Sequence, residues 1–243
     1  MPLVDDIYLN TGSAAVTGAA NLNVGALVTG IGPAGRIYTY DIVPVTANTA
    51  AYGVLQTPST GAITLAGSTS VSTATVNGTT VYQADVPRCV QIASGGNDAG
   101  ITFTVQGYDL YGQAMTQTVT GVSAAAVTTA KAFYQVKAVT HTGSVASTVT
   151  VGTADVFGLP FFLKDRGYIA SVGWGGTAAQ SAVSATVGVT TTPATAFTGD
   201  VRGTYQTGSA SNGTNRLVLS QVIGTGQVGT AATTVSLIGV TQA

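Results

Sequence analysis

The charged and long-chain residues that build stable helices are scarce in this chain, and residues that favour extended backbone or turns are abundant. The sequence contains no Glu, few Lys, Leu, Met and Gln, about 40 Thr and 32 Gly. Thr, Val and Tyr suit strands and Gly suits turns, whereas Glu, Lys, Leu, Met and Gln support helices. This composition excludes a helical bundle, a coiled coil and a doubly wound α/β enzyme. We therefore expect an all-β protein.

Charge is equally scarce. Only 7% of the 243 residues are charged, and the formal net charge is -1, whereas an average soluble domain has about 25% charged residues. Nucleic-acid binding needs grouped Lys and Arg, and the sequence has no such cluster, so no nucleic acid is expected as a partner. A surface with few charges favours packing against other protein.

Targeting and membrane signals are also missing. The longest strongly apolar run, Val156–Leu163, is interrupted by Pro160 and is far shorter than the ~18 residues of a spanning helix. The first residues lack the basic and apolar regions of a secretory signal. Cys89 is the single cysteine, so no intrachain disulfide can form. We expect synthesis in a cytoplasm and no membrane partner.

Two hairpins stand out in the pattern. Asn77-Gly78 separates two strand-like runs within Ser72–Gln83, and this dipeptide favours a type I′ turn. Apolar and polar residues alternate on both sides of the turn Asp109–Gly112, which predicts a second hairpin over 101–120. Arg36–Val43 reads as a strand that Pro44 ends.

Further strands are expected at regular spacing along the rest of the chain, while residues 45–68 read as a loop. These strands are predicted at 132–140, 145–151, 168–173, 183–189, 215–223 and 233–240. Turn signals at intervals of about 8–12 residues are typical of a sandwich or barrel. We expect an antiparallel β-sandwich, jelly-roll-like in topology. We expect residues 1–32 to form an extended N-terminal arm, 33–156 to form the sandwich, and 157–243 either to complete it or to form a second small β-region.

Catalytic and ligand motifs are weak. Gly30–Gly35 and Gly224–Gly229 match G-x-G-x-x-G, but strand-like residues follow both, whereas a nucleotide loop needs a following helix. His141 is the single histidine, and the sequence alone leaves a Cys89–His141 dyad open. Asn97–Gly100 fits either an Asx turn or a weak calcium loop, and the turn is favoured. We expect no catalytic residue, cofactor or metal.

Two short segments are candidates for a protein interface. Charged residues directly follow Phe161-Phe162 in one, and the other spans Gly199–Tyr205. Aromatic anchors with Arg at the rim are typical of interfaces, although a solvated turn beside a core strand gives the same pattern. The candidate interface residues are Phe161, Phe162, Lys164, Arg166, Arg202 and Tyr205.

Two stretches resemble virion proteins of tailed bacteriophages. Arg88–Gly121, RCVQIASGGNDAGITFTVQGYDLYGQAMTQTVTG, resembles a hairpin common in such proteins, and Thr192–Tyr205, TPATAFTGDVRGTY, is similar to a segment of capsid-associated proteins of short-tailed phages. The resemblance implies an all-β capsid decoration (cement) protein. Its partners would be the major capsid protein and further copies of itself, its place the outer capsid surface, and it would be made in the host cytoplasm.

The sequence leaves two alternative functions open. The first is a neck, tail or fibre-base protein of the same kind of virion. The second is a carbohydrate-binding, adhesin-like β-domain, which the Tyr residues and the lone Trp174 in Gly-Trp-Gly-Gly suggest, because aromatic faces on a surface can hold a ligand.

Overall fold

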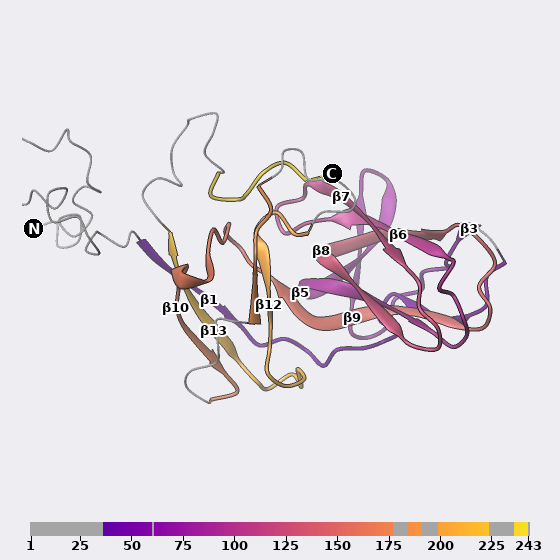
Figure 1. The fold of residues 1–243 in the computed structure, drawn as a ribbon, viewed down its shortest axis with the longest axis horizontal. Helices are drawn as coiled ribbons and strands as arrows, with labels where there is room; N and C mark the ends of the chain where they lie inside the picture. The colour runs from indigo at the N-terminus through magenta and orange to yellow at the C-terminus, as the bar shows by residue number, and fades with distance from the viewer. Residues whose placement is uncertain (1–35, 60, 177–183, 191–198, 224–235, 243) are drawn as a thin grey trace, which may run out of the picture.

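The protein is an all-β molecule of antiparallel strands (Figure 1). The computed structural model describes residues 36–59, 61–176, 184–190, 199–223 and 236–242, so the expected arm over 1–32 lies outside the described residues. No α-helix occurs within those ranges. The elements are β1 (Arg36–Ile42), β2 (Gly53–Gln56), β3 (Gly61–Ala62), β4 (Ser72–Val76), β5 (Thr79–Ser94), β6 (Thr102–Tyr108), β7 (Ala114–Thr120), β8 (Ala126–His141), β9 (Val149–Gly158), the 3-10 helix η4 (Arg166–Tyr168), β10 (Ile169–Trp174), β11 (Ala185–Val187), β12 (Gly203–Gln206) and β13 (Leu217–Ile223).

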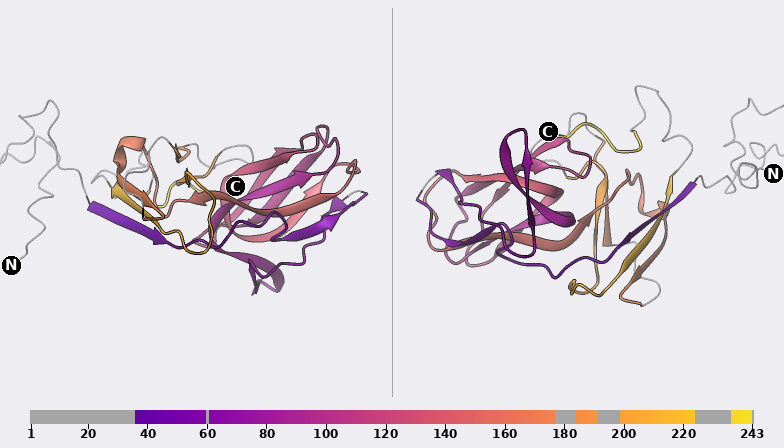
Figure 2. Two further views of the ribbon diagram at one scale, coloured as in Figure 1. Left: turned by 90° about the horizontal axis from the view of Figure 1, so that it is seen from below. Right: turned by 180° about the vertical axis from the view of Figure 1, so that it is seen from behind.

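The strands form two sheets. The large sheet has the order β11-β12-β9-β5-β8-β6-β7, and the shorter strands β2, β3 and β4 pair with β9, β8 and β5, respectively. The small sheet has the order β1-β13-β10. Figure 2 shows the large sheet curling on itself, with the small sheet at one end of the molecule. The predicted antiparallel, sandwich-like fold is confirmed.

Both predicted hairpins are present. At the tip of the β4–β5 hairpin, Asn77 has φ 50 and Gly78 has φ 74, the left-handed conformations of a type I′ turn. The β6–β7 turn places Gly112 at φ 76, and Asp109 Oδ1 accepts hydrogen bonds from the amides of Tyr111 and Gln113, both at 2.8 Å. Short-range turn chemistry therefore fixes both connections.

Other elements differ from the expectations. The segment 45–68 contains the short strands β2 and β3, and β12 forms within a segment that the sequence suggested as an interface. Residues 236–240, the described part of the strand expected at 233–240, form only an isolated bridge between Ser236 and Gly239. Pairing to distant strands decides these cases, because a four-residue strand such as β12 carries too little periodicity to be recognised.

Two main apolar cores fill the fold. The first includes Phe103, Phe133 and Val151, inside the curl of the large sheet. The second includes Phe157 and Leu219 and lies where the small sheet meets β9, β11 and β12. Strand β9 supplies residues to both cores and crosses the boundary proposed after residue 156; the division into 33–156 and 157–243 stays a prediction.

Candidate functional site

Several of the charged side chains in the described part of the chain are buried in its interior. Six charged side chains are no more than 2% exposed. They are Arg88, Asp98, Asp109, Lys131, Asp200 and Arg202. Burying a charge is costly unless it is paired and hydrogen-bonded, so each must be matched by groups from other parts of the chain.

Arg202 joins the start of β12 to the β6–β7 turn. Its Nη1 donates to Asp109 Oδ2 at 2.8 Å, and its Nε donates to the Leu159 carbonyl at 3.1 Å. The ring of Tyr111 lies against its guanidinium, 5.2 Å from centroid to Cζ. The pair Arg202–Asp109 is almost fully buried, which identifies it as an internal clamp.

Asp200 and Lys131 lie close to this clamp. Asp200 accepts hydrogen bonds from the amides of Ala132 and Arg202, at 3.0 and 2.9 Å. Burial raises the pKa of the Asp200 carboxyl, and the nearby Arg202 charge and these two hydrogen bonds oppose the rise. Burial also lowers the pKa of the Lys131 ammonium. The raised pKa of Asp200 follows from its place within the core.

Arg88 forms a second clamp in β5. Its guanidinium donates to both oxygens of Asp85 at 2.9 Å and to the Val45 carbonyl at 2.6 Å. It also reaches Ser211 Oγ at 3.3 Å and stacks over the ring of Phe157, 5.0 Å from the centroid. This one side chain therefore ties β5 to the segment after β1 and to the loop before β13.

The six candidate interface residues divide into two groups. Phe162, Arg202 and Tyr205 are at most 3% exposed, so they pack inside the chain and cannot form the rim of an interface in this structure. Phe161 is half-buried, and Lys164 and Arg166 are exposed. The expectation is therefore corrected for the three buried residues, whose apolar or paired surroundings explain why they lie inside.

The candidates for chemistry are not brought together. Cys89 on β5 lies opposite Ala132 on β8, whereas His141 is nine positions further along β8, opposite Phe103 on β6 and Gly61 on β3. Burial raises the pKa of the Cys89 thiol, which disfavours the nucleophilic thiolate. The dyad that the sequence left open is therefore wrong.

The candidate ligand-binding residues that the structure describes make contacts within the chain. Asn97 Oδ1 accepts from the Ala99 amide, as in an Asx turn, and Asp98 is buried. No group of three or more His, Cys, Asp or Glu side chains that could hold a metal occurs among the described residues. Trp174 is 4% exposed and donates to Ser209 Oγ at 2.8 Å, so it offers no surface to a sugar. Both G-x-G-x-x-G motifs, over 30–35 and 224–229, lie wholly outside the described residues.

One end of the molecule has a distinct surface, which we name the loop end. It comprises the described residues of 53–62, 94–101, 121–125 and 142–148. Backbone hydrogen bonds join these loops: Gly95 to Thr148, Ala124 to Gly96, and Val145 to Pro58. Beneath them Asp98 accepts from Ser94 Oγ and from the Ala146 amide. The loop end is therefore a connected surface rather than separate loops.

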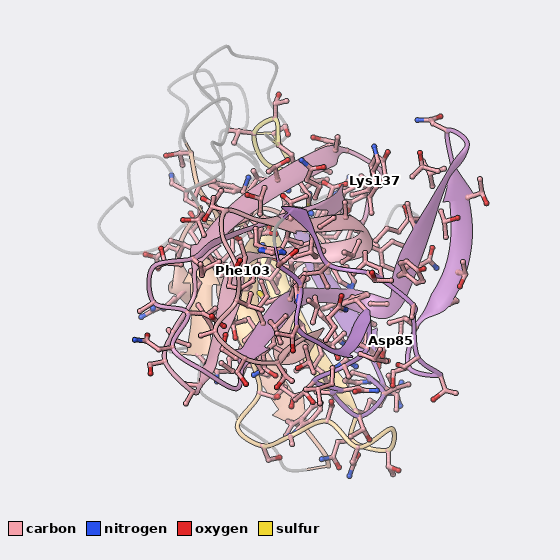
Figure 3. All side chains as sticks on the ribbon, turned by 90° about the vertical axis from the view of Figure 1, so that its right-hand side faces the viewer. Asp85, Phe103 and Lys137 are labelled. Carbon is pink, nitrogen blue, oxygen red and sulfur yellow. The ribbon has the colours of Figure 1, made fainter. Side chains whose placement is uncertain are left out.

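The loop end carries no exposed charge. Its one charged residue is the buried Asp98. Across the described part of 43–154, the exposed charged residues are Asp85 and Lys137. Figure 3 labels both, on the side toward the projecting β4–β5 hairpin. Sequence reasoning missed this surface, although the lack of any charged residue between Asp41 and Asp85 is a signal that could have indicated it.

An apolar projection lies within the loop end. Pairing of β2 with β9 is irregular between Gly53 and Gln56, and the two residues between them, Val54 and Leu55, are 53% and 66% exposed. The Gln56 side chain fixes this bulge, because its Nε2 donates to the Val54 and Thr64 carbonyls and its Oε1 accepts from the Thr64 amide. Two large apolar side chains are thus held outward by a rigid support.

Comparisons with protein-family models, with curated proteins and with solved structures found no match. A search for membrane-spanning segments found no helix long and apolar enough to cross a bilayer in the described ranges.

Proposed function

We propose that this protein is a structural protein of a tailed-bacteriophage virion, a cement protein that binds the outer surface of the assembled capsid and stabilises it. The major capsid protein and further copies of the chain are its partners, and the capsid surface is its place after synthesis in the host cytoplasm. The observation that carries the proposal is the loop end, an uncharged surface with exposed Val54 and Leu55.

An uncharged surface lowers the cost of covering it. When exposed charges are buried at an interface they lose hydration, and this loss often exceeds the energy of the new ion pair. The loop end has no such charge to desolvate. Val54 and Leu55 supply apolar area, which stabilises association by about 25 cal/mol per Å² removed from water.

The support beneath the loop end favours binding to a fixed lattice. Asp98 joins two of the loops, and Gln56 holds the bulge. A surface that is already ordered loses less conformational entropy on binding. The segment Arg88–Gly121, which resembles phage virion proteins, supplies the loop 94–101 and begins the loop 121–125.

Preferential binding to the assembled shell accounts for stabilisation. A ligand that binds the assembled state and not its separated subunits shifts the equilibrium toward the assembled state. Many copies on one lattice add to this effect when contacts between neighbours link them. No catalytic group, cofactor or nucleic acid is needed for such a role.

Binding to shells tests the surface. Purified shells that lack this protein are mixed with wild-type chain, Val54→Asp, or the matched control Val187→Asp, which changes an exposed Val in β11, 40% exposed. We expect wild type and Val187→Asp to co-sediment with shells and Val54→Asp to bind at least about tenfold more weakly, because it places an unpaired charge in the contact. Failure of the wild-type chain to bind shells contradicts the proposed function, and equal binding of both variants contradicts the assignment of the surface.

Particle composition and heat resistance test the role. Quantitative mass spectrometry of purified particles should give hundreds of copies per particle, as the symmetry of a shell requires, and particles without the protein should release their DNA at a lower temperature. A count of roughly a dozen copies would instead indicate a neck, tail or fibre-base protein with ring symmetry.

A further inference from the structure

We propose that β1 is a self-association edge, at which two copies of this chain pair antiparallel and join their small sheets into one six-stranded sheet. In the described part of the chain, β1 pairs with β13 on one side and with no strand on the other. This inference concerns a different surface from the loop end and does not depend on capsid binding.

The sequence of β1 leaves its edge suited to pairing. Exposed edge strands usually carry Lys, Pro, a bulge or a very short length, each of which prevents pairing with another chain. β1 has no Lys, Pro or Gly, and its charged residues, Arg36 and Asp41, lie toward its two ends. Its register with β13 is uninterrupted over all seven residues, and Ile37 is 61% exposed.

Other described edges differ from β1 in these respects. Pairing of β10 is irregular between Ile169 and Ser171, β11 has three residues and β4 has five. β7 also has seven residues, but it carries no large exposed apolar side chain. Among these edges β1 combines length, regular register and exposed apolar surface.

Symmetry selects one register. A two-fold axis perpendicular to the sheet keeps the inner faces of both copies on the same side, so opposed residues must belong to the same face of β1. The register that pairs all seven residues places Thr39 opposite the Thr39 of the second copy. Tyr38 then lies opposite Tyr40 on the inner face, and Ile37 lies opposite Asp41 on the outer face.

The charges and aromatic residues of β1 fit a second copy in this register. No like charges are opposed, because Asp41 faces Ile37 and already pairs with Arg216 of its own chain. Opposed aromatic residues stabilise antiparallel strands. Tyr38 already packs on Phe161, with ring centroids 4.8 Å apart, and Gln221 Nε2 holds this loop by donating to the Phe162 carbonyl at 2.9 Å. The half-buried Phe161 thus borders the proposed interface.

Charge reversal at the symmetry axis tests the register. In full-length chains, Thr39→Lys opposes two Lys residues and Thr39→Glu opposes two Glu residues, whereas an equal mixture of the variants opposes Lys to Glu. Thr75→Lys, at an exposed Thr of the β4 edge, is the matched control. Far-UV circular dichroism of each variant checks that the sheets form.

Sedimentation equilibrium from about 1 µM to about 1 mM covers the affinities typical of a small interface. We expect wild type and Thr75→Lys to dimerise, each Thr39 variant alone to dimerise at least about tenfold more weakly, and their mixture to recover dimers. A wild-type chain that stays monomeric over this range, or Thr39 variants that dimerise as wild type does, would overturn the proposal.

Cross-linking gives a second measurement, and it requires only the replacement of Thr39 by the similarly small residue Cys. Thr39→Cys is treated with a short bis-maleimide, and Thr75→Cys is the control, since the native Cys89 is buried. Cross-linked dimers of Thr39→Cys and none of Thr75→Cys are expected. Absence of a cross-link at position 39 in a chain that dimerises contradicts this register.

Discussion

Arg202 is separated from Asp109 by 93 positions in the sequence, yet the two side chains form an ion pair that is almost fully buried. Arg88 similarly joins Asp85 to the distant Ser211. A chain with few charges thus uses several of them to hold its interior together, and its surface at the loop end is left neutral. If one residue of such a buried ion pair is removed, the charge of the other is left buried without a partner, which is unfavourable.

Removing one partner of the Arg202–Asp109 pair should be strongly destabilising. Arg202→Met leaves the Asp109 carboxylate buried without its cation, and we expect the free energy of unfolding in urea to fall by about 3–5 kcal/mol. The double variant Arg202→Met/Asp109→Asn should recover part of this loss. The exposed control Lys164→Met should change stability by less than about 0.5 kcal/mol. Equal stability of Arg202→Met and wild type would contradict the clamp.

Asp200 should make stability increase as the pH falls. Its pKa is raised by burial, so between the unfolded value of 3.8 and the raised value the folded state binds more protons than the unfolded state. Stability then rises as pH decreases through that window. The difference in unfolding free energy between wild type and Asp200→Asn should therefore shift in favour of wild type from pH 7 to pH 4.

Asp41 supplies a control of opposite sign. Its hydrogen bond with Arg216 lowers the pKa of the Asp41 carboxyl, so its contribution is present at neutral pH and is lost as the pH falls below the unfolded value of 3.8. The advantage of wild type over Asp41→Asn should therefore shrink when the measurement is extended to pH values below 3.8. A wild-type advantage over Asp200→Asn that shrinks toward pH 4 would contradict the prediction for Asp200.

At the scale of elements, close backbone contact between strands limits what the sheet can accept. Gly107 lies in β6 where the register with β8 shifts. A Cβ at this position would lie 1.9 Å from the Gln135 carbonyl oxygen, a contact that only backbone movement can relieve. The close approach of β6 to β8 at this point therefore depends on this glycine.

Gly107→Ala should lower the free energy of unfolding by about 1–3 kcal/mol, the usual cost of overpacking, or more. Gly100→Ala is the matched control, because nothing lies within 4 Å of a Cβ there, and it should change stability by less than about 0.5 kcal/mol. Urea unfolding of both variants gives the comparison. Similar stability of the two variants would show that β6 and β8 can separate at little cost.

At the scale of the whole molecule, the two apolar cores share strands. β9 contributes Val149 and Val151 to the first core and Phe157 to the second, and Arg88 on β5 stacks on Phe157. Loss of one core therefore removes support from the other. This arrangement favours unfolding of the described strands as one unit, while the division at residue 156 stays a prediction.

Unfolding curves followed by two probes should therefore coincide. Trp174 is the single tryptophan and lies in the second core, so its fluorescence reports that core, while far-UV circular dichroism reports all strands. We expect equal midpoints and slopes in urea, the criterion of two-state behaviour. A fluorescence midpoint clearly below or above the circular dichroism midpoint would show that the regions unfold separately.

The all-β class and both hairpins were predictable because their causes are local. Asn77-Gly78 and Gly112 fix turns through the conformations of one or two residues, and alternation around Phe103 fixes a face through the two-residue period of a strand. Composition excluded helices for the same reason, since propensity acts residue by residue.

Only the tertiary structure decided where the charges and several aromatic residues lie. Arg202 and Trp174 read as surface groups in the sequence, but Asp109 and Ser209, both remote along the chain, make their burial favourable. The uncharged loop end, and the edge of β1 that no described strand covers, likewise arise from strands brought together across the chain. Whether a polar side chain is buried depends on the groups that pair with it. Those groups lie far away in the sequence, so a local sequence pattern does not reveal them, and only the folded chain brings them into contact.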